Sequence, residues 1–439
     1  MSDLKGFTNT ASAGCTGAVN SVPKGWTSAE LSDFCDTVGG GTPDRSVEEY
    51  WNGEIPWASP TEITTRHSKY ISKTKESITL KGLEKSSAKL HPPGTVLMTS
   101  RASIGYVAIN TVPMATNQGF QSLRCKKNAL ADYIYQYITW IRPELERMSA
   151  GSTFSEISSS SVKRLRATLP PLSEQKKIAA ILSSVDEVIE KTRAQIDKLK
   201  DLKAGMMQEL LTKGIGHTEF KDSPVGRIPV RWDCVLLEEV AAVQTGVAKN
   251  SNSKGDMISV PYLRVANVQD GYLNLTEIKY IEIDKGRLSR FSLQPDDVLV
   301  NEGGDFDKIG RGAIWKGLIS PCVHQNHVFV VRTMKDQLLP EFFNYLSGSQ
   351  YGKSYYLGCA KQTTNLASLN SSQLKMFPVL LPSIAEQECI CKNLGAIDQK
   401  QRLLEEKLAG KINIKRALMQ DLLTGKVRVQ VEARELAEA

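Results

Sequence analysis

Candidate catalytic motifs occur at several places in the 439-residue sequence, and each lacks a part that its chemistry needs. Residues 348–354 resemble a phosphate-binding loop, but only three residues separate the first glycine from the Gly-Lys pair, where the loop needs four. Residues 39–41 have the wrong spacing for a dinucleotide fingerprint. The Pro-Pro pairs at 92–93 and 170–171 lack the flanking residues of a loop that holds a flipped adenine. We therefore assign no catalytic residue.

Possible metal ligands are clustered in two segments of the second half. Cys322 and His324 would share one face of a strand, whereas His327 would point away, and no second ligand pair is evident. We expect no metal there and expect both histidines at a polar surface. Segment 302–308 holds three carboxylates and a lysine, but a metal-dependent nuclease draws its carboxylates from adjacent strand ends, and these lie in one glycine-rich loop. A solvated turn is the favoured interpretation.

The elements that must position these residues occur twice along the chain. Residues 169–175 align with residues 381–387 at an offset of 212, and residues 207–212 align with 419–424 at the same offset. Similarities between the preceding segments drift in offset from 202 to 209, which indicates loops of different length between shared elements. A repeat of this kind defines the architecture. It predicts a variable unit and a conserved helix, followed by a second variable unit and a second conserved helix.

The repeat divides the chain into six segments. They are an N-terminal segment 1–21, a first globular unit 22–168, a first helical spacer 169–215, a second globular unit 216–380, a second helical spacer 381–427 and a C-terminal tail 428–439 without a recognisable counterpart.

The two spacers have the strongest secondary-structure signal. Each follows a proline, carries a glutamate in its first turn and ends near a glycine that can cap a helix. An apolar heptad pattern begins at Ile178, with Thr192, Gln195 and Glu209 as its exceptions. The residues expected to pack the helices are Ile178, Ile181, Val185, Val188, Leu199, Leu202 and Met206 in the first, and Ile390, Leu394, Ile397, Leu404, Leu408, Leu418 and Leu422 in the second.

Helix length decides what the spacers pack against. About 38 residues at 1.5 Å each give roughly 57 Å per helix, which is longer than either globular unit needs for its own core. One possibility is a long helix that lies across a single domain. We favour two helices packed on one another as an antiparallel coiled coil that relates the two halves by a pseudo-twofold.

The globular units read as mixed α+β structure. Short β-branched runs such as 95–98 and 328–331 alternate with Gly- and Pro-rich turns, and each unit has one aromatic helix before its spacer. The fold class is therefore α+β, with two mixed globular units joined by two long helices.

Composition and charge restrict the function classes. Hydrophobic residues make up 41% and charged residues 23%, and no apolar run is long enough to span a membrane. The first twenty residues have no secretory pattern, which favours the cytoplasm, and the eight scattered cysteines favour reduced thiols. The net charge of +7 includes +4 in segment 22–168 and +1 in segment 216–380, with nearly neutral helices. This balance permits nucleic acid as a partner.

The whole pattern resembles the specificity subunit of a type I restriction-modification enzyme. The resemblance rests on two divergent units, each followed by a Leu-Pro-x-x-x-Glu-Gln helix that ends in Met-Gln-Glu/Asp-Leu-Leu-Thr. It covers essentially all of the chain after residue 20. Shorter pieces agree with it, among them Gly-Gly-Gly-Thr-Pro at 39–43, Thr-Asn-Gln at 116–118 and Ile-Gly-Arg-Gly at 309–312.

The resemblance implies a function and a set of partners. Each globular unit would be a target recognition domain that reads one half of a split double-stranded DNA site. The paired helices would set the distance between the half-sites and dock two modification subunits, and restriction subunits would join that core. S-adenosylmethionine, ATP and Mg²⁺ are implied for those partner subunits, and no cofactor is expected in this chain. The subunit itself would be non-catalytic.

Base edges are read by arginine, asparagine, glutamine, serine or threonine on exposed loops, sometimes with aromatic or lysine contacts. For each such residue, an ordinary solvated position remains the alternative. The candidates in the first unit are Thr42, Arg45, Trp57, Arg66, Arg101, Ser103, Asn117 and Gln118. Those in the second unit are Lys249, Arg264, Asn267, Arg311, Gln325, Asn326, Lys361 and Gln362, and Glu302 or Asp305 could accept from a cytosine amine.

Two other functions compete with this interpretation. One is a DNA adenine methyltransferase with fused recognition domains, against which the missing cofactor and base-flipping loops already argue. The other is a coiled-coil adaptor without a nucleic-acid role, which would not bind DNA even at low salt.

Overall fold

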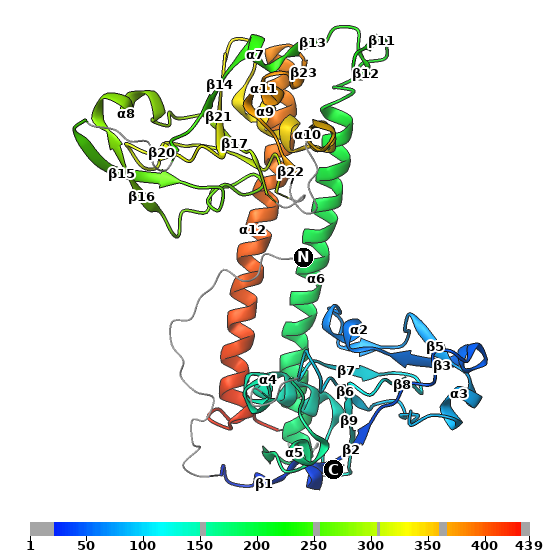
Figure 1. Ribbon diagram of the computed structural model, residues 1–439. Helices are drawn as coiled ribbons and strands as arrows, with labels where there is room; N and C mark the ends of the chain where they lie inside the picture. Colours follow the sequence, from blue (N-terminus) through cyan, green and yellow to red (C-terminus); the bar gives the residue numbers. More distant parts are fainter. Residues whose placement is uncertain (1–21, 150–154, 249–254, 305–307, 360–366, 432–439) are drawn as a thin grey trace. The chain divides into compact units, whose positions relative to one another are not determined.

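A computed structural model describes residues 22–149, 155–248, 255–304, 308–359 and 367–431. The chain divides into two compact units, of which unit 1 combines residues 1–194 with 406–439 and unit 2 contains residues 195–405. The long helices α6 (Leu172–Leu210) and α12 (Ile384–Leu423) each contribute one part to each unit (Figure 1). The last turns of the second long helix therefore complete the first unit.

Unit 1 is a mixed α+β structure that ends in helix α6. Its elements before α6, in chain order, are β1 (Thr27–Glu30), α1 (Leu31–Phe34), β2 (Cys35–Gly39), the 3-10 turn η1 (Glu48–Tyr50), β3 (Trp51–Ala58), α2 (Pro60–Thr64), β4 (Tyr70–Ile71), β5 (Glu76–Ile78), α3 (Leu80–Glu84), β6 (Val96–Met98), β7 (Val107–Asn110), β8 (Ala115–Thr116), β9 (Gln121–Cys125), α4 (Ala131–Ser149), α5 (Ser159–Lys163) and β10 (Arg166–Leu169).

The strands of unit 1 form a five-stranded sheet in the order β2-β9-β6-β7-β4 and a three-stranded sheet in the order β5-β3-β8, while β1 pairs with β10. Strand β3 runs parallel to β8 and antiparallel to β5. Helix α4 packs its apolar face, which includes Tyr133 and Ile138, into the main core. The same core takes in Leu182 of α6 and Leu422 of α12, so the long helices belong to the interior of this unit.

Unit 2 contains the remaining elements between the two long helices. In chain order they are β11 (Phe220–Ser223), β12 (Gly226–Pro229), β13 (Asp233–Leu236), α7 (Leu237–Val240), β14 (Ala241–Thr245), β15 (Met257–Leu263), β16 (Lys279–Asp284), α8 (Lys285–Phe291), β17 (Val298–Asn301), β18 (Gly303–Gly304), β19 (Gly312–Ile314), β20 (Val323–His324), β21 (Val328–Thr333), α9 (Pro340–Gly348), α10 (Gln350–Cys359), β22 (Ala367–Ser368), α11 (Ser371–Lys375) and β23 (Pro378–Leu381).

The strand orders of unit 2 repeat those of unit 1. A four-stranded sheet β14-β21-β17-β19 matches the first four strands of the larger sheet of unit 1, and β16-β15-β20 matches the three-stranded sheet, including its parallel pair. Strands β13 and β23 pair as β1 and β10 do. The hairpin β11-β12 and the pair β18-β22 belong to unit 2. The predicted fold, two mixed α+β units with two long helices, is confirmed.

The glutamine of each repeated Glu-Gln pair fixes the loop before the aromatic helix. Gln175 accepts a hydrogen bond from Leu130 N (2.9 Å) and donates to the carbonyl oxygens of Asn128 and Pro170 (2.9 Å each). Gln387 makes the same three bonds in unit 2, to Leu339 N (2.8 Å), Gln337 O (2.8 Å) and Pro382 O (3.0 Å). Both glutamines are buried, so these bonds satisfy polar groups that water does not reach.

The glutamate of each pair anchors a buried tryptophan. Trp26 Nε1 donates to Glu174 (3.3 Å) and Trp232 Nε1 donates to Glu386 (3.0 Å). Each carboxylate also binds the segment that follows a long helix: Arg428 pairs with Glu174, and His217 Nε2 lies 2.9 Å from Glu386 Oε1.

The segments that follow the two long helices turn in the same way. Gly214 after α6 and Gly425 after α12 both have φ near +70°, a conformation that suits glycine at a helix end. A side chain at either glycine would meet the tryptophan of its unit. Residues 425–428, which span the end of the second predicted spacer and the first residue of the predicted tail, therefore have a counterpart in residues 214–217.

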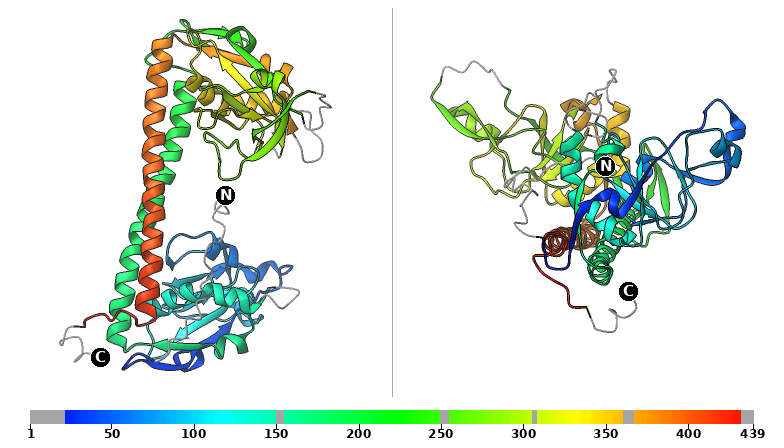
Figure 2. Two further views of the ribbon diagram at one scale, coloured as in Figure 1. Left: turned by 90° about the vertical axis from the view of Figure 1, so that its left-hand side faces the viewer. Right: turned by 90° about the horizontal axis from the view of Figure 1, so that it is seen from below.

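The two long helices lie side by side (Figure 2), and the buried stripe of each follows a strict heptad. In α6 the stripe is Ile178, Leu182, Val185, Ile189, Thr192, Ile196, Leu199, Lys203, Met206 and Leu210, all buried or half-buried. The equivalent stripe of α12 is Ile390, Leu394, Ile397, Gln401, Leu404, Leu408, Lys411, Lys415, Leu418 and Leu422.

Two of the predicted packing residues of α6 were wrong. Val188 is 40% exposed and Leu202 is 51% exposed, whereas their neighbours Ile189 and Lys203 lie on the stripe. The sequence has apolar residues at both adjacent positions in several turns, so the heptad phase could not be settled from polarity alone.

Two ion pairs show the direction in which the helices run. In unit 1, Lys415 Nζ of α12 lies 2.6 Å from Asp186 Oδ1 of α6, and in unit 2 Lys203 Nζ of α6 lies 2.5 Å from Asp398 Oδ1 of α12. The two aspartates are equivalent in the repeat, and so are the two lysines. The pairing is thus reciprocal, and its order along the chain is antiparallel. Asp186 also accepts from Gln136 (2.7 Å) and Asp398 from Tyr345 (2.8 Å), which ties each aspartate to α4 or α9.

Candidate nucleic-acid interface

Several loops of unit 1 meet in one group, which we call loop cluster 1. It comprises residues 40–42, 99–105, 116–119 and 155–157. Peptide groups hold it together: Gly41 N donates to Thr116 O (2.9 Å), Ser100 N donates to Gly119 O (2.7 Å) and Ile157 N donates to Ser100 O (3.0 Å). Because these bonds are made by the backbone, the side chains of the cluster can change without loss of the loop arrangement.

Unit 2 builds an equivalent group, loop cluster 2, from residues 246–248, 301–304, 324–327 and 367–369. The corresponding backbone bonds are Val247 N to His324 O (2.8 Å), Glu302 N to His327 O (3.0 Å) and Leu369 N to Glu302 O (2.8 Å). One backbone scaffold therefore carries two different sets of side chains.

Three predicted base contacts of unit 1 lie side by side in loop cluster 1. The Thr42 hydroxyl donates to Gln118 Oε1, and Asn117 Oδ1 accepts from Gly119 N (2.8 Å). Gln118 is exposed, and its amide nitrogen donates no hydrogen bond to another described residue. Its amide hydrogens are therefore directed to solvent, where a base could accept them.

Arg101 and Ser103 also lie in loop cluster 1. Arg101 Nε is 2.8 Å from Glu156 Oε1, with the two side chains 48% and 40% exposed. This pairing fixes the guanidinium at the surface of the cluster. Ser103 is half-buried, and its carbonyl oxygen accepts from the Thr99 hydroxyl.

The other three candidates of unit 1 lie outside the cluster. Arg45 stacks over the ring of Trp51, 4.1 Å from its centroid, and pairs with Glu76. Arg66 Nε donates to Tyr70 O (3.0 Å). Trp57 is 2% exposed and donates from Nε1 to Gly41 O (2.9 Å), so it is a core residue and cannot be the base contact that was predicted.

In unit 2 the structure brings Gln325 and Asn326 into loop cluster 2, and Arg311 adjoins it through a bond from Asn301 N to Arg311 O (2.8 Å). Asn267 is 3% exposed, and its side chain binds Arg264 N, which fastens the turn after β15. The prediction that Asn267 contacts a base was therefore wrong.

Arg264 itself pairs with Glu277 across the same turn, at 3.4 Å. The candidates Lys249, Lys361 and Gln362, and Asp305, lie outside the described residues.

The prediction that both His324 and His327 lie at a polar surface is wrong for His324 and correct for His327. His324 is 1% exposed, not at a polar surface, and burial lowers its pKa to about 4, so the ring is neutral at pH 7. His91, which lies within 3.5 Å of the Thr116 hydroxyl, is also fully buried, and burial together with Arg124 lowers its pKa to about 4. His327 does lie at the surface, with Nδ1 2.6 Å from Glu302 Oε2. The alternation of strand faces could have indicated that His324 points inward.

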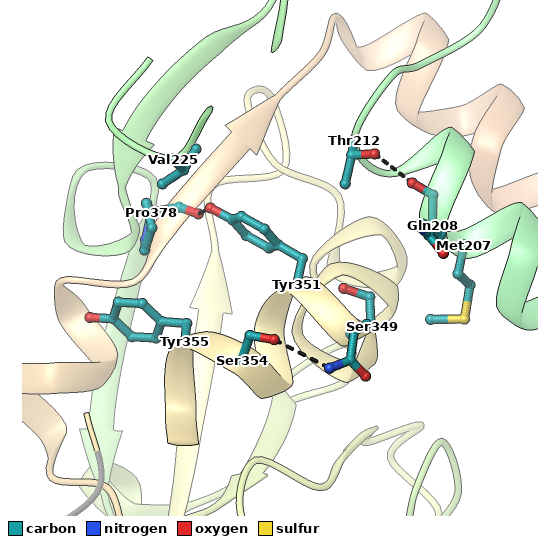
Figure 3. A pocket seen from close by; sticks show the side chains of 10 residues that line it. Met207, Gln208, Thr212, Val225, Ser349, Tyr351, Ser354, Tyr355 and Pro378 are labelled. Carbon is teal, nitrogen blue, oxygen red and sulfur yellow. Dashed lines mark hydrogen bonds between the residues drawn. The ribbon is translucent and has the colours of Figure 1, made fainter. Parts of the chain in front are cut away.

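A pocket of about 490 Å³ lies in unit 2 at the C-terminal end of α6 (Figure 3). Its lining is Met207, Gln208, Thr212, Val225, Ser349, Gln350, Tyr351, Ser354, Tyr355 and Pro378. The Tyr351 hydroxyl donates to Pro378 O (2.7 Å), and burial raises the pKa of this phenol. The lining has no nucleophile beside a base, so the pocket is suited to binding an apolar group and not to acid-base chemistry.

No group of three or more histidine, cysteine or carboxylate side chains in the described segments could hold a metal ion. Among these same segments, no helix combines the length and the apolar composition needed to cross a membrane. The described cysteines are free thiols, and Cys35 and Cys125 bring their sulfurs within 3.9 Å of each other.

Comparison with known proteins agrees with this architecture. A family described as type I restriction modification DNA specificity domain matches residues 23–201 and again residues 229–413. The chain therefore belongs to this family and contains its domain twice.

Individual relatives carry the same description. The chain is 32% identical over 260 residues to the type I restriction enzyme MjaIX specificity subunit of Methanocaldococcus jannaschii, a match that spans 58% of this chain and 60% of that protein. It is 26% identical to the MjaVIII specificity subunit of the same organism, over 86% of this chain and 87% of that one. It is 23% identical to the EcoKI specificity subunit of Escherichia coli K12, over 85% and 82%. None of these relatives favours the fused methyltransferase.

Solved structures share the fold. The type I restriction-modification S subunit from M. genitalium superimposes with a TM-score of 0.54 at 16% identity, over 90% of this chain and 96% of that one. A chain from a study of complex assembly in the type I R-M system superimposes with a TM-score of 0.56 at 18% identity, over 93% and 100%.

Proposed function

We propose that this chain is the DNA-reading subunit of a type I restriction-modification complex. Unit 1 reads one half of a bipartite site through loop cluster 1, and unit 2 reads the other half through loop cluster 2. One observation carries this proposal: the two loop clusters are closed by equivalent backbone hydrogen bonds but present different side chains. Two unlike surfaces on one repeated frame suit a site with two unlike halves.

The long helices supply the frame in this proposal. Reciprocal ion pairs and matching heptads join the two helix segments within each unit, and the length of the helices would set the separation of the half-sites. DNA rises 3.4 Å per base step on each strand, so a helix of roughly 57 Å spans at most about 17 steps.

The helix ends are suited to docking the same partner twice. Gln208 and Gln420 are equivalent in the repeat, and both are exposed. We place two modification subunits there, with the restriction subunits joined to that core. The apolar pocket beside Gln208 supports this placement in unit 2.

The chemistry belongs to the partners in this proposal. Modification subunits would bind S-adenosylmethionine and methylate adenine, and restriction subunits would use ATP and Mg²⁺. The chain itself would be non-catalytic.

The test is to map methylated adenines in DNA from cells that express the complex with wild-type chain or with N117A/Q118A. We expect the variant to relax or change the letters of one half-site and to leave the other half and the spacing intact. A bidentate base contact contributes about 1–3 kcal/mol of discrimination.

The matched control is Q325A/N326A, which we expect to affect only the other half-site. Labelled methyl transfer to DNA by the purified chain alone would refute the non-catalytic assignment. Loss of both half-sites in either variant would refute the division of reading between the clusters.

A further inference from the structure

Helix α8 of unit 2 carries two arginines on one aromatic ring. The guanidinium carbons of Arg287 and Arg290 lie 5.2 and 5.4 Å from the centroid of the Phe291 ring. A cation over an aromatic ring is attracted by the negative face of the ring. Phe291 is only 6% exposed, so the ring is a fixed platform for both cations.

Neither arginine has a carboxylate partner among the described residues. Two carboxylates at the start of α8 have other partners: Asp256 pairs with Lys285 at 2.6 Å, and Asp284 Oδ1 accepts from Gly286 N at 2.8 Å. In contrast, Arg45 of unit 1 stacks on tryptophan but also pairs with Glu76. Two adjacent cations without a counter-ion produce a local positive potential that favours an anion.

The platform adjoins loop cluster 2. Phe291 and Leu288 pack in one apolar cluster with Val247, a residue of loop cluster 2, and with Val323, which directly precedes segment 324–327 of that cluster. Gln244 Nε2, near the end of β14, donates to Arg290 O, and Leu293 N donates to Cys322 O (2.8 Å). Helix α8 is therefore held against the strands from which the loops of the cluster emerge.

We propose that Arg287 and Arg290 bind the phosphate backbone of DNA beside the half-site read by loop cluster 2. The inference rests on the proposed DNA-reading function and adds a contact that carries no sequence information. A guanidinium stacked by its face presents its N–H groups at its edge, where a phosphate oxygen accepts them. Contacts of this kind fix the register of a protein on the duplex while base contacts supply the sequence preference.

The proposal is compatible with the low net charge of the second globular segment. That segment is only +1, yet the two unpaired charges are concentrated next to the reading loops. Attraction to DNA depends on the local potential at the contact surface, which the sum over the whole segment does not describe.

The experiment measures DNA binding by the assembled complex of full-length chain and modification subunits as a function of salt. The probes are a short duplex of mixed sequence and a duplex that carries the mapped target site. The variants are R287Q/R290Q and the control R227Q, because Arg227 also stacks on a phenylalanine of unit 2, Phe220, at 5.9 Å. Thermal unfolding of each variant confirms that it is folded.

Each phosphate contact contributes about 0.9 to the slope of log affinity against log salt. We expect R287Q/R290Q to lower the magnitude of the slope by about 1.8. When salt rises fourfold, the fold-loss of affinity should therefore be roughly ten times smaller for the variant than for wild type. Affinity should fall equally for both duplexes, with an unchanged target preference, and R227Q should match wild type.

Three results would contradict the proposal: an unchanged slope in R287Q/R290Q, an equal loss of slope in R227Q, or a loss of affinity confined to the target duplex. If wild-type complex binds neither duplex, the proposed DNA-reading function itself fails. The two failures are therefore distinguishable.

Discussion

Units 1 and 2 share a scaffold and differ in how they place charge upon it. Their sheets share a strand order, apart from the extra strand β4 of unit 1, and their loop clusters are closed by three equivalent backbone bonds. The cluster arginine of unit 1, Arg101, is paired with Glu156, whereas the stacked pair Arg287 and Arg290 of unit 2 has no carboxylate among the described residues. The backbone hydrogen bonds that close the loop clusters are thus equivalent in the two units, while the side chains and charges differ.

The anchors at the start of the long helices teach the complementary lesson. Glu174 and Glu386 each accept a hydrogen bond from a buried tryptophan, but the second partner is Arg428 in unit 1 and His217 in unit 2. A poorly exposed carboxylate needs donors more than it needs one particular residue. The second partner therefore differs between the units, while the carboxylate is the same.

The largest effect should come from the anchored tryptophans. W232A and W26A should each lower the free energy of unfolding of their own unit by about 3–5 kcal/mol, because both rings are buried and leave a cavity. Native-state hydrogen exchange, resolved by segment, measures this for each unit separately. W51A, at a half-buried ring, is the control and should cost less. A loss confined to one unit in both variants would break the equivalence of the anchors.

The second effect concerns acid sensitivity, which the two units should share. Burial holds the pKa of His91 and His324 at about 4 in the folded protein, against about 6.5 in the unfolded chain. The unfolded state therefore binds protons that the folded state does not as pH falls from 6.5 to 4, so stability falls over that window. The loss approaches about 3 kcal/mol per histidine at pH 4.

Denaturant titrations at several pH values measure this loss. H91Q and H324Q should each flatten the profile, while H67Q, at an exposed histidine, should leave it unchanged. If H67Q flattens the profile as much as H324Q does, burial is not the source of the acid sensitivity.

The smallest effect should come from a paired surface arginine. Arg45 and Glu76 are 57% and 40% exposed, so R45Q should destabilise unit 1 by less than about 1 kcal/mol, and the loss should shrink at high salt. Denaturant unfolding at low and high salt measures it. R290Q, at an arginine without a carboxylate partner, provides the comparison in unit 2 and should show no such salt dependence. Equal salt dependence in the two variants would contradict the assigned difference between the units.

Most of the fold could be predicted from the sequence repeat. An aligned pair of Glu-Gln helices indicates two equivalent units, and the geometry confirms both long helices and the mixed units before them. The heptad phase of α6 was missed at Val188 and Leu202, since apolar residues stand on both sides of the true stripe. Local polarity cannot choose between two adjacent stripes when only packing against the partner helix distinguishes them.

The site was harder to predict than the fold. Thr42 and Gln118 are in contact because the backbone bond from Gly41 N to Thr116 O joins the turns that carry them, a contact that their sequence positions did not predict. Trp57 and Asn267 suit DNA by residue type, yet both are buried for structural reasons that depend on distant parts of the chain. The arginine pair on the Phe291 ring could not be predicted from the sequence. The sequence does not show which arginines lack a carboxylate partner in the folded chain.

The composition of unit 1 has a consequence for biosynthesis. Its core brings Leu182 together with Leu422 and Leu423, and Glu174 pairs with Arg428. All of unit 2 lies between these two parts of unit 1 in the sequence. At 5–20 residues per second, the ribosome needs on the order of 10 to 50 s to make the intervening chain. The domain that is synthesised first is therefore completed last, and unit 2 can finish folding while unit 1 still exposes an unfilled apolar seam.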